Sequence, residues 1–82
     1  MNFIVYILRN KIGKIYIGQT KDVNKRVLVH NETGTGYTSK YRPWELVYKE
    51  KYSTRSEAMQ RKKFLKSGAG RDWIKNEILK GD

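Results

Sequence analysis

The sequence lacks cysteine, holds a single proline and has few acidic residues for its length. Without cysteine the chain has no disulfide cross-links, thiolate metal ligands or thiol nucleophile. No apolar run approaches the roughly 18 residues needed to cross a bilayer, and the first residues lack the charged and small-residue signals of a cleaved leader. These absences predict a soluble, unprocessed protein that does not enter a membrane, with the cytoplasm as its simplest compartment.

Basic residues are in large excess. Lys and Arg number 18 against 8 Asp and Glu, so the formal charge is +10 over 82 residues. A field of this sign attracts polyanions and makes their binding depend on salt. Nucleic acid is therefore the leading partner class, although basic charge that serves only solubility gives the same composition. Because so short a chain buries a modest core, we expect one domain over residues 1–82 with its site on the surface or in a shallow cleft.

Two short runs at the start of the chain predict a β-hairpin. Residues 3–8 are rich in β-branched and aromatic side chains, residues 14–18 alternate, and residues 10–13 supply a turn between them. Alternation places Tyr6 on the opposite face of its strand from its two chain neighbours, and Tyr16 likewise. The hairpin therefore carries one tyrosine on each strand.

The residues after the hairpin predict a helix and then a loop. Asp22 can cap a helix running to about His30, with Val23 and His30 on its inner stripe. Arg26 lies one turn before His30. Residues 31–40 are polar, contain two glycines and lack periodicity, which predicts a loop of the kind that often carries function.

The second half of the chain predicts one more strand and two helices. Residues 44–49 follow the only proline and alternate between large apolar and charged side chains, as a third strand would. The segment 54–57 matches a capping box that opens a helix over residues 55–66. Gly68 is placed to end that helix with a left-handed cap, and a last helix spans residues 71–79. The resulting order, ββαβαα, is an α+β arrangement.

Four polar-tipped side chains are expected to converge near the hairpin. Tyr6 and Tyr16 lie on neighbouring strands, and Arg26 and His30 lie on the helix that follows. Phosphodiester hydrolysis needs an activated water and neutralisation of charge on the phosphoryl oxygens. Tyrosine can orient or deprotonate water, and arginine can hold a phosphate in a fork. Taken singly, each residue also has an ordinary role, since strand tyrosines and a histidine on an apolar face usually serve packing.

The order and spacing of these segments resemble those of the GIY-YIG endonuclease superfamily, in particular the small stand-alone domains related to the catalytic half of bacterial excision-repair and branched-DNA nucleases. The likeness covers nearly the whole chain, from Ile4 through Leu65. The segments that carry it are Val5-Tyr6-Ile7, Tyr16-Ile17-Gly18-Gln19-Thr20, Asp22-Val23 leading to Arg26, His30-Asn31, Tyr37-Thr38, Arg42-Pro43-Trp44-Glu45-Leu46, and Ser56-Glu57-Ala58 followed by Phe64-Leu65-Lys66.

The resemblance implies a three-stranded antiparallel sheet flanked by helices and a one-metal hydrolysis of DNA that uses Mg²⁺ or Mn²⁺. Tyr6 and Tyr16 would flank the nucleophilic water, with Tyr16 as a candidate general base. Arg26 would stabilise charge on the phosphate, and His30 would assist proton handling or orient a tyrosine. Val5 stands where the motif that gives the family its name has its first glycine, and valine suits a strand at this position.

The chain departs from the family in the second long helix. The resemblance implies a glutamate metal ligand five residues after Glu57, and Lys62 stands at that position. Glu57 cannot substitute, because five residues advance a helix by about 500° and leave the two positions about 140° apart. Either the Lys62 ammonium takes over part of the role of the metal, or hydrolysis is lost and the fold survives as a binding module. The lysine at position 62 fits a natural substitution and an engineered knock-out equally well.

Further basic and aromatic residues are candidates for nucleic-acid binding. Lysines and arginines along the first helix, the loop and the second long helix could follow a phosphate backbone, and a loop tyrosine could stack on an unpaired base. The predicted partner is DNA, whether single-stranded, branched or duplex. An RNA-binding module is a weaker alternative, and a partner protein would be one source of added specificity. The candidates are Lys21, Lys25, Tyr37, Lys40, Arg42, Arg61, Lys62 and Lys63.

Overall fold

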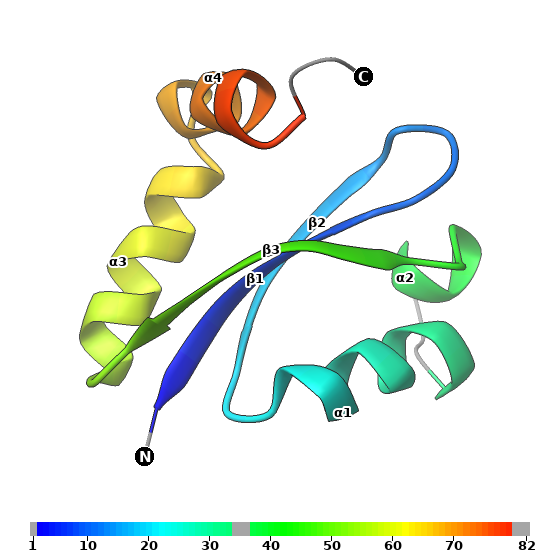
Figure 1. Ribbon diagram of the computed structural model, residues 1–82, viewed down its shortest axis with the longest axis horizontal. Helices are drawn as coiled ribbons and strands as arrows, with labels where there is room; N and C mark the ends of the chain where they lie inside the picture. Colours follow the sequence, from blue (N-terminus) through cyan, green and yellow to red (C-terminus); the bar gives the residue numbers. More distant parts are fainter. Residues whose placement is uncertain (1, 34–36, 80–82) are drawn as a thin grey trace.

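The computed structural model describes residues 2–33 and 37–79 and contains one three-stranded antiparallel sheet. The strands are β1 (Phe3–Arg9), β2 (Ile15–Thr20) and β3 (Glu45–Tyr52), in the order β2-β1-β3. Helices cover both faces of the sheet (Figure 1). The α+β class, the hairpin and the third strand are confirmed, and β3 extends further than residues 44–49.

The helices are α1 (Val23–Leu28), the π-helical turn η1 (Val29–Thr33), α2 (Tyr37–Lys40), α3 (Arg55–Leu65) and α4 (Gly68–Glu77). Asp22 caps α1 as predicted, since its carboxylate accepts a bond from the backbone N–H of Lys25 at 3.1 Å. The prediction of a loop over 31–40 is wrong where η1 and α2 form, and residues 34–36 of that segment lie outside the described residues. Its lack of periodicity hid both elements because each is too short to show a helical repeat.

Alternation along β1 divides the interior into two clusters, one on each face of the sheet. Val5 and Ile7 pack with α3 and α4, whereas Tyr6 and its alternate neighbours pack with α1 and Trp44. Figure 1 shows these two layers as α3 and α4 on one side of the strands and α1 and α2 on the other. As the middle strand, β1 is buried on both faces, so a single run of five buried residues, Ile4 to Leu8, contributes to both clusters.

The junction of α3 and α4 differs from the sequence prediction. Thr54 caps α3 as expected, accepting from the backbone N–H of Glu57 at 3.2 Å. Gly68, however, does not end α3 in a left-handed conformation; it is the first residue of α4, which is capped by Ser67. The serine hydroxyl accepts from the backbone N–H of Gly70 at 3.2 Å, so α4 begins three residues earlier than predicted.

The described helices are all too short or too polar to cross a membrane.

Candidate functional site

Tyr6 and His30 form a buried hydrogen-bonded pair. Tyr6 is 1% exposed and His30 is 6% exposed, and the tyrosine oxygen lies 2.8 Å from His30 Nε2. Burial raises the pKa of Tyr6, and burial together with the nearby Arg26 charge lowers the pKa of His30. Both groups are therefore neutral near pH 7, so the hydrogen bond joins two uncharged side chains. The other ring nitrogen, His30 Nδ1, is buried and has no hydrogen-bond partner among the described residues.

Gly18 makes room for the ring of Tyr6. The two residues are direct partners in the β1–β2 ladder, so their side-chain positions lie on the same face. A Cβ at position 18 would come within 2.4 Å of the tyrosine ring carbon that bears the hydroxyl. Because no rotamer change at residue 18 can relieve a clash at Cβ, this position requires glycine, and the glycine fixes where the Tyr6 hydroxyl lies.

Tyr16 and Arg26 complete the predicted set around this pair. The ring of Tyr16 lies 4.7 Å from the His30 ring and 6.2 Å from the Tyr6 ring, centroid to centroid. Arg26 is exposed on α1, and its charge acts on the pKa values of both Tyr6 and His30. The fold thus brings all four predicted catalytic residues together. Trp44 also contacts this group, with its ring 6.3 Å from that of Tyr16, and its indole N–H donates to the carbonyl of Thr38.

A basic cavity of about 900 Å³ lies beside the cluster, between α3 and the segment that joins β2 to α1. We call it the α3 pocket. Six basic side chains and one carboxylate contribute to its lining, and Arg26 is among the six, which connects the pocket to the Tyr6–His30 pair. The lining residues are Phe3, Gln19, Thr20, Lys21, Asp22, Arg26, Arg55, Met59, Lys62, Lys63 and Lys66.

One stripe along α3 supplies three of the six basic side chains of this pocket. Arg55, Met59, Lys62 and Lys66 are spaced at i, i+4, i+7 and i+11, so they share one face of the helix. Burial lowers the pKa of Lys62, and the like charge of Lys66 adds to this effect. An anion bound between the two ammonium groups would relieve their repulsion. Sequence reasoning included Lys66 among the basic residues of this helix but missed Arg55, although the helical spacing of the stripe was a visible signal.

The residues of the α3 pocket do not fit a divalent cation. Its lone carboxylate, Asp22, is engaged in capping α1. Glu57 is engaged at the start of α3, where it accepts from the hydroxyl of Thr54 at 3.0 Å. Within residues 2–33 and 37–79, no three His, Asp or Glu side chains gather closely enough to hold a metal ion. Lys62 instead adds a positive charge to a surface that is already cationic.

The remaining predicted nucleic-acid contacts are dispersed. Lys21 lies in the α3 pocket, its ammonium 5.5 Å from the centre of the Phe3 ring. Lys25 is exposed on α1 outside the pocket. Arg42 donates to the carbonyls of Asn31 and Glu32, both at 3.2 Å, and so caps η1, while Lys40 lies over the ring of Tyr41. The side chain of Tyr37 lies outside the described residues.

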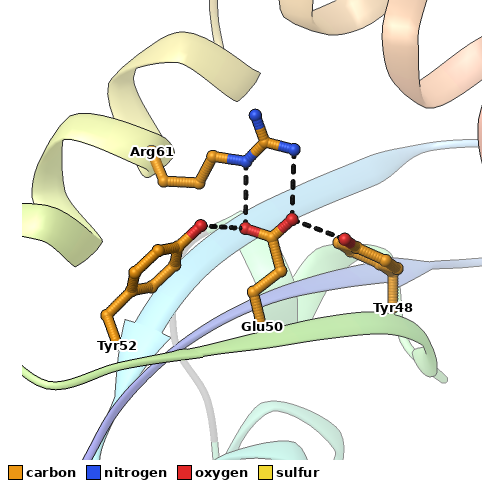
Figure 2. Close-up of polar contacts among 4 residues, drawn as sticks. All are labelled: Tyr48, Glu50, Tyr52 and Arg61. Carbon is orange, nitrogen blue, oxygen red and sulfur yellow. Dashed lines mark hydrogen bonds and ion pairs between the residues drawn. The ribbon is translucent and has the colours of Figure 1, made fainter.

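Arg61 is directed away from the α3 pocket and into the fold. Its guanidinium donates to both oxygens of Glu50, from Nε at 2.9 Å and from Nη2 at 3.0 Å. Tyr48 and Tyr52 donate to the same carboxylate, one to each oxygen (Figure 2). The guanidinium also lies 4.7 Å from the centre of a Trp73 ring. These contacts give Arg61 a structural role that connects α3 to β3, and a contact with nucleic acid remains an untested prediction.

The family model of the GIY-YIG catalytic domain matches residues 2–75, and the chain belongs to this family. It is a family of nucleases that act on DNA and are generally metal-dependent. The chain is 48% identical over 64 residues to a UPF0213 protein of Staphylococcus epidermidis, and 42% identical over 64 residues to one of Staphylococcus saprophyticus; each match covers 77% of this chain and 78% of the relative.

A solved structure also resembles this fold. The solution structure of the UPF0213 protein BH0048 from Bacillus halodurans aligns with a TM-score of 0.57 at 34% sequence identity, covering 99% of this chain and 87% of that chain. The names of these relatives specify no activity. The family resemblance inferred from the sequence is therefore confirmed, whereas the reaction of this particular chain must be argued from its own residues.

Proposed function

We propose that this chain is a GIY-YIG domain that binds the phosphate backbone of DNA in the α3 pocket, and that its capacity to hydrolyse the bound phosphodiester is strongly reduced or lost. The observation that carries the proposal is the set of six basic side chains that line the pocket, with Lys62 among them. Such a surface favours phosphate, and its binding is expected to weaken steeply as salt rises.

Within this proposal, Arg26 holds the phosphate oxygens next to the Tyr6–His30 pair. Its planar guanidinium can donate two parallel hydrogen bonds to a phosphate. Lys62 supplies one further charge but cannot activate a water in the way a bound metal ion does. Burial keeps Tyr6 protonated, so it cannot take a proton from water, and its hydroxyl is hydrogen-bonded to His30 Nε2. The general base must then be Tyr16 or His30, and without a metal-activated water beside it we expect a low hydrolytic rate.

An active nuclease is the second candidate function. The observation that favours it is the assembly of Tyr6, Tyr16, Arg26 and His30 around one point, because a pure binding surface needs no buried tyrosine–histidine pair. The two candidates predict different responses to divalent metal. A binding module holds DNA equally well in chelator, whereas a nuclease of this family needs the metal in order to cut.

The deciding experiment measures binding and cleavage on the same end-labelled DNA, supplied as single-stranded, duplex and branched forms, with Mg²⁺, Mn²⁺ or EDTA. The chain is compared with Lys62→Glu and with Tyr6→Phe. We expect chelator-independent binding by the chain and metal-dependent cleavage only by Lys62→Glu. Cleavage by the chain that is lost in Tyr6→Phe would instead establish an active nuclease.

Failure to retain any DNA form at low salt would refute both candidates. Competition with RNA of the same length then tests the choice of nucleic acid, because the proposal requires DNA to compete at least as well as RNA.

A further inference from the structure

A second basic cavity, of about 680 Å³, lies between β2 and α4. We call it the α4 pocket. Three basic side chains from different elements contribute to its lining: Lys14 before β2, Lys66 at the end of α3, and Arg71 on α4. No carboxylate lines it. The other lining residues are Ile15, Tyr16, Ile17 and Ile74.

Nothing in the described part of the chain neutralises these three charges. Lys14 makes a cation–π interaction instead, in which its ammonium lies 5.0 Å from the centre of the Tyr41 ring. Like charges gathered around a partly apolar cavity repel one another, which disfavours this arrangement in the free protein. An anionic ligand with apolar parts would offset that cost. A nucleic-acid strand offers both, in its phosphates and its bases.

Two residues connect this cavity to the candidate site. Lys66 lines both the α3 pocket and the α4 pocket, so the two cavities adjoin. Tyr16 borders the α4 pocket, and its ring lies on the opposite face of β2, where it contacts His30. The basic surface therefore does not end with the basic residues of α3. It continues past Tyr16 to Arg71, at the opposite end of β2 from α1.

Building on the proposed function, we propose that the two pockets form one continuous path for a single nucleic-acid strand along the β2 edge of the sheet. The α3 pocket holds one stretch of phosphates, and the α4 pocket holds the next, around Lys14, Lys66 and Arg71. A base in the α4 pocket packs against its apolar lining, Ile15, Ile17 and Ile74, which requires that the base be unpaired. The path therefore selects single-stranded segments over duplex of the same sequence.

The test measures the affinity of fluorescently labelled single strands of 4, 8 and 16 nucleotides, in EDTA, by anisotropy at several salt concentrations. The variants are Lys14→Gln/Arg71→Gln for the α4 pocket, Lys62→Gln for the α3 pocket, and Lys49→Gln as a control of matched chemistry on β3, at the far edge of the sheet. Circular dichroism verifies that each variant is folded. An unlabelled duplex of the same sequence serves as competitor.

We expect the double variant to bind the 16-nucleotide strand at least tenfold more weakly than the control, with the salt slope reduced by about 0.7 for each removed charge. The variant should also lose most of the gain in affinity between 4 and 16 nucleotides, because the α4 pocket extends the site. Lys62→Gln should weaken binding at every length. The duplex should compete less well than the single strand.

The outcomes separate this inference from the proposed function. If Lys62→Gln weakens binding while Lys14→Gln/Arg71→Gln behaves like Lys49→Gln, the α4 pocket is not part of the path, yet the proposed function stands. Equal competition by duplex overturns the preference for a single strand. If Lys62→Gln and the double variant both match Lys49→Gln, the proposed function and this inference fail together.

Discussion

The two faces of the sheet each carry a tyrosine network, and the two networks differ in whether their hydrogen bonds are complete. On one face the Glu50 carboxylate accepts from Tyr48, from Tyr52 and twice from Arg61. On the other face Tyr6 is hydrogen-bonded to His30, whose second ring nitrogen is buried and has no partner among the described residues. A complete network stabilises a fold, whereas a buried polar atom without a partner is a feature that functional sites often show.

The titration behaviour of the two networks follows from this difference. Burial alone would raise the pKa of Glu50, but hydrogen bonds from Arg61, Tyr48 and Tyr52 outweigh it and lower that pKa below 4.5. Burial and the bond to Glu50 raise the pKa of Tyr52 to about 12. The Glu50 network thus keeps a charge that is fully paired. The Tyr6–His30 pair instead avoids charge, because burial disfavours both the tyrosinate and the imidazolium.

The largest expected effect comes from breaking the complete network with Glu50→Gln. The substitution leaves a half-buried guanidinium without its carboxylate, which should lower the free energy of unfolding by about 2 to 3 kcal/mol. Urea denaturation measures this loss. Glu45→Gln, exposed on the same strand, should change stability by less than about 0.5 kcal/mol. Equal stability of the two variants would mean that the Glu50 network contributes nothing to the fold.

Gly18→Ala acts only on the incomplete network. The added methyl overlaps the Tyr6 ring, so the tyrosine must move away from His30 at an expected cost of about 2 kcal/mol. The control is Gly68→Ala, because a Cβ at that position meets no atom within 4 Å and the residue begins a helix. Thermal unfolding of both variants tests the pair. A Gly18→Ala protein as stable as Gly68→Ala would show that Tyr6 has room to move.

The smallest effect concerns pH. The two networks should lose their contributions to folding stability over different pH ranges. Because the pKa of His30 is lowered from 6.5, the unfolded chain binds a proton before the folded one, so stability falls as pH drops below about 6.5. The loss cannot exceed about 1.4 kcal/mol for each pH unit. Glu50, whose pKa is lowered from 4.5, contributes a separate loss below about pH 4.5.

Denaturant titrations from pH 7.5 to 3.5 resolve these two steps. His30→Gln should remove the upper step and retain the lower one. An upper step that persists in His30→Gln would assign it to another group.

The local chemistry of the chain predicted most of the fold. Alternation in β1 correctly assigned Tyr6 and Val5 to opposite faces, and Asp22 and Thr54 capped the helices that they were expected to begin. These predictions succeeded because pleat periodicity and capping depend on residues a few positions apart. The α2 helix and the start of α4 at Gly68 were missed, because short elements and their junctions are determined by packing against distant residues.

The candidate site divides in the same way. Tyr6, Tyr16, Arg26 and His30 were predicted from order and spacing, and the fold brings them together, while their catalytic roles stay predictions. By itself the sequence determined the residues on each face, the excess of basic charge, and the lysine at position 62. Only the tertiary structure decided which cations share a cavity, pairing Arg61 with Glu50 and joining Lys66 to Lys14 and Arg71. Those neighbours come from elements far apart in the chain, so no local pattern encodes their proximity.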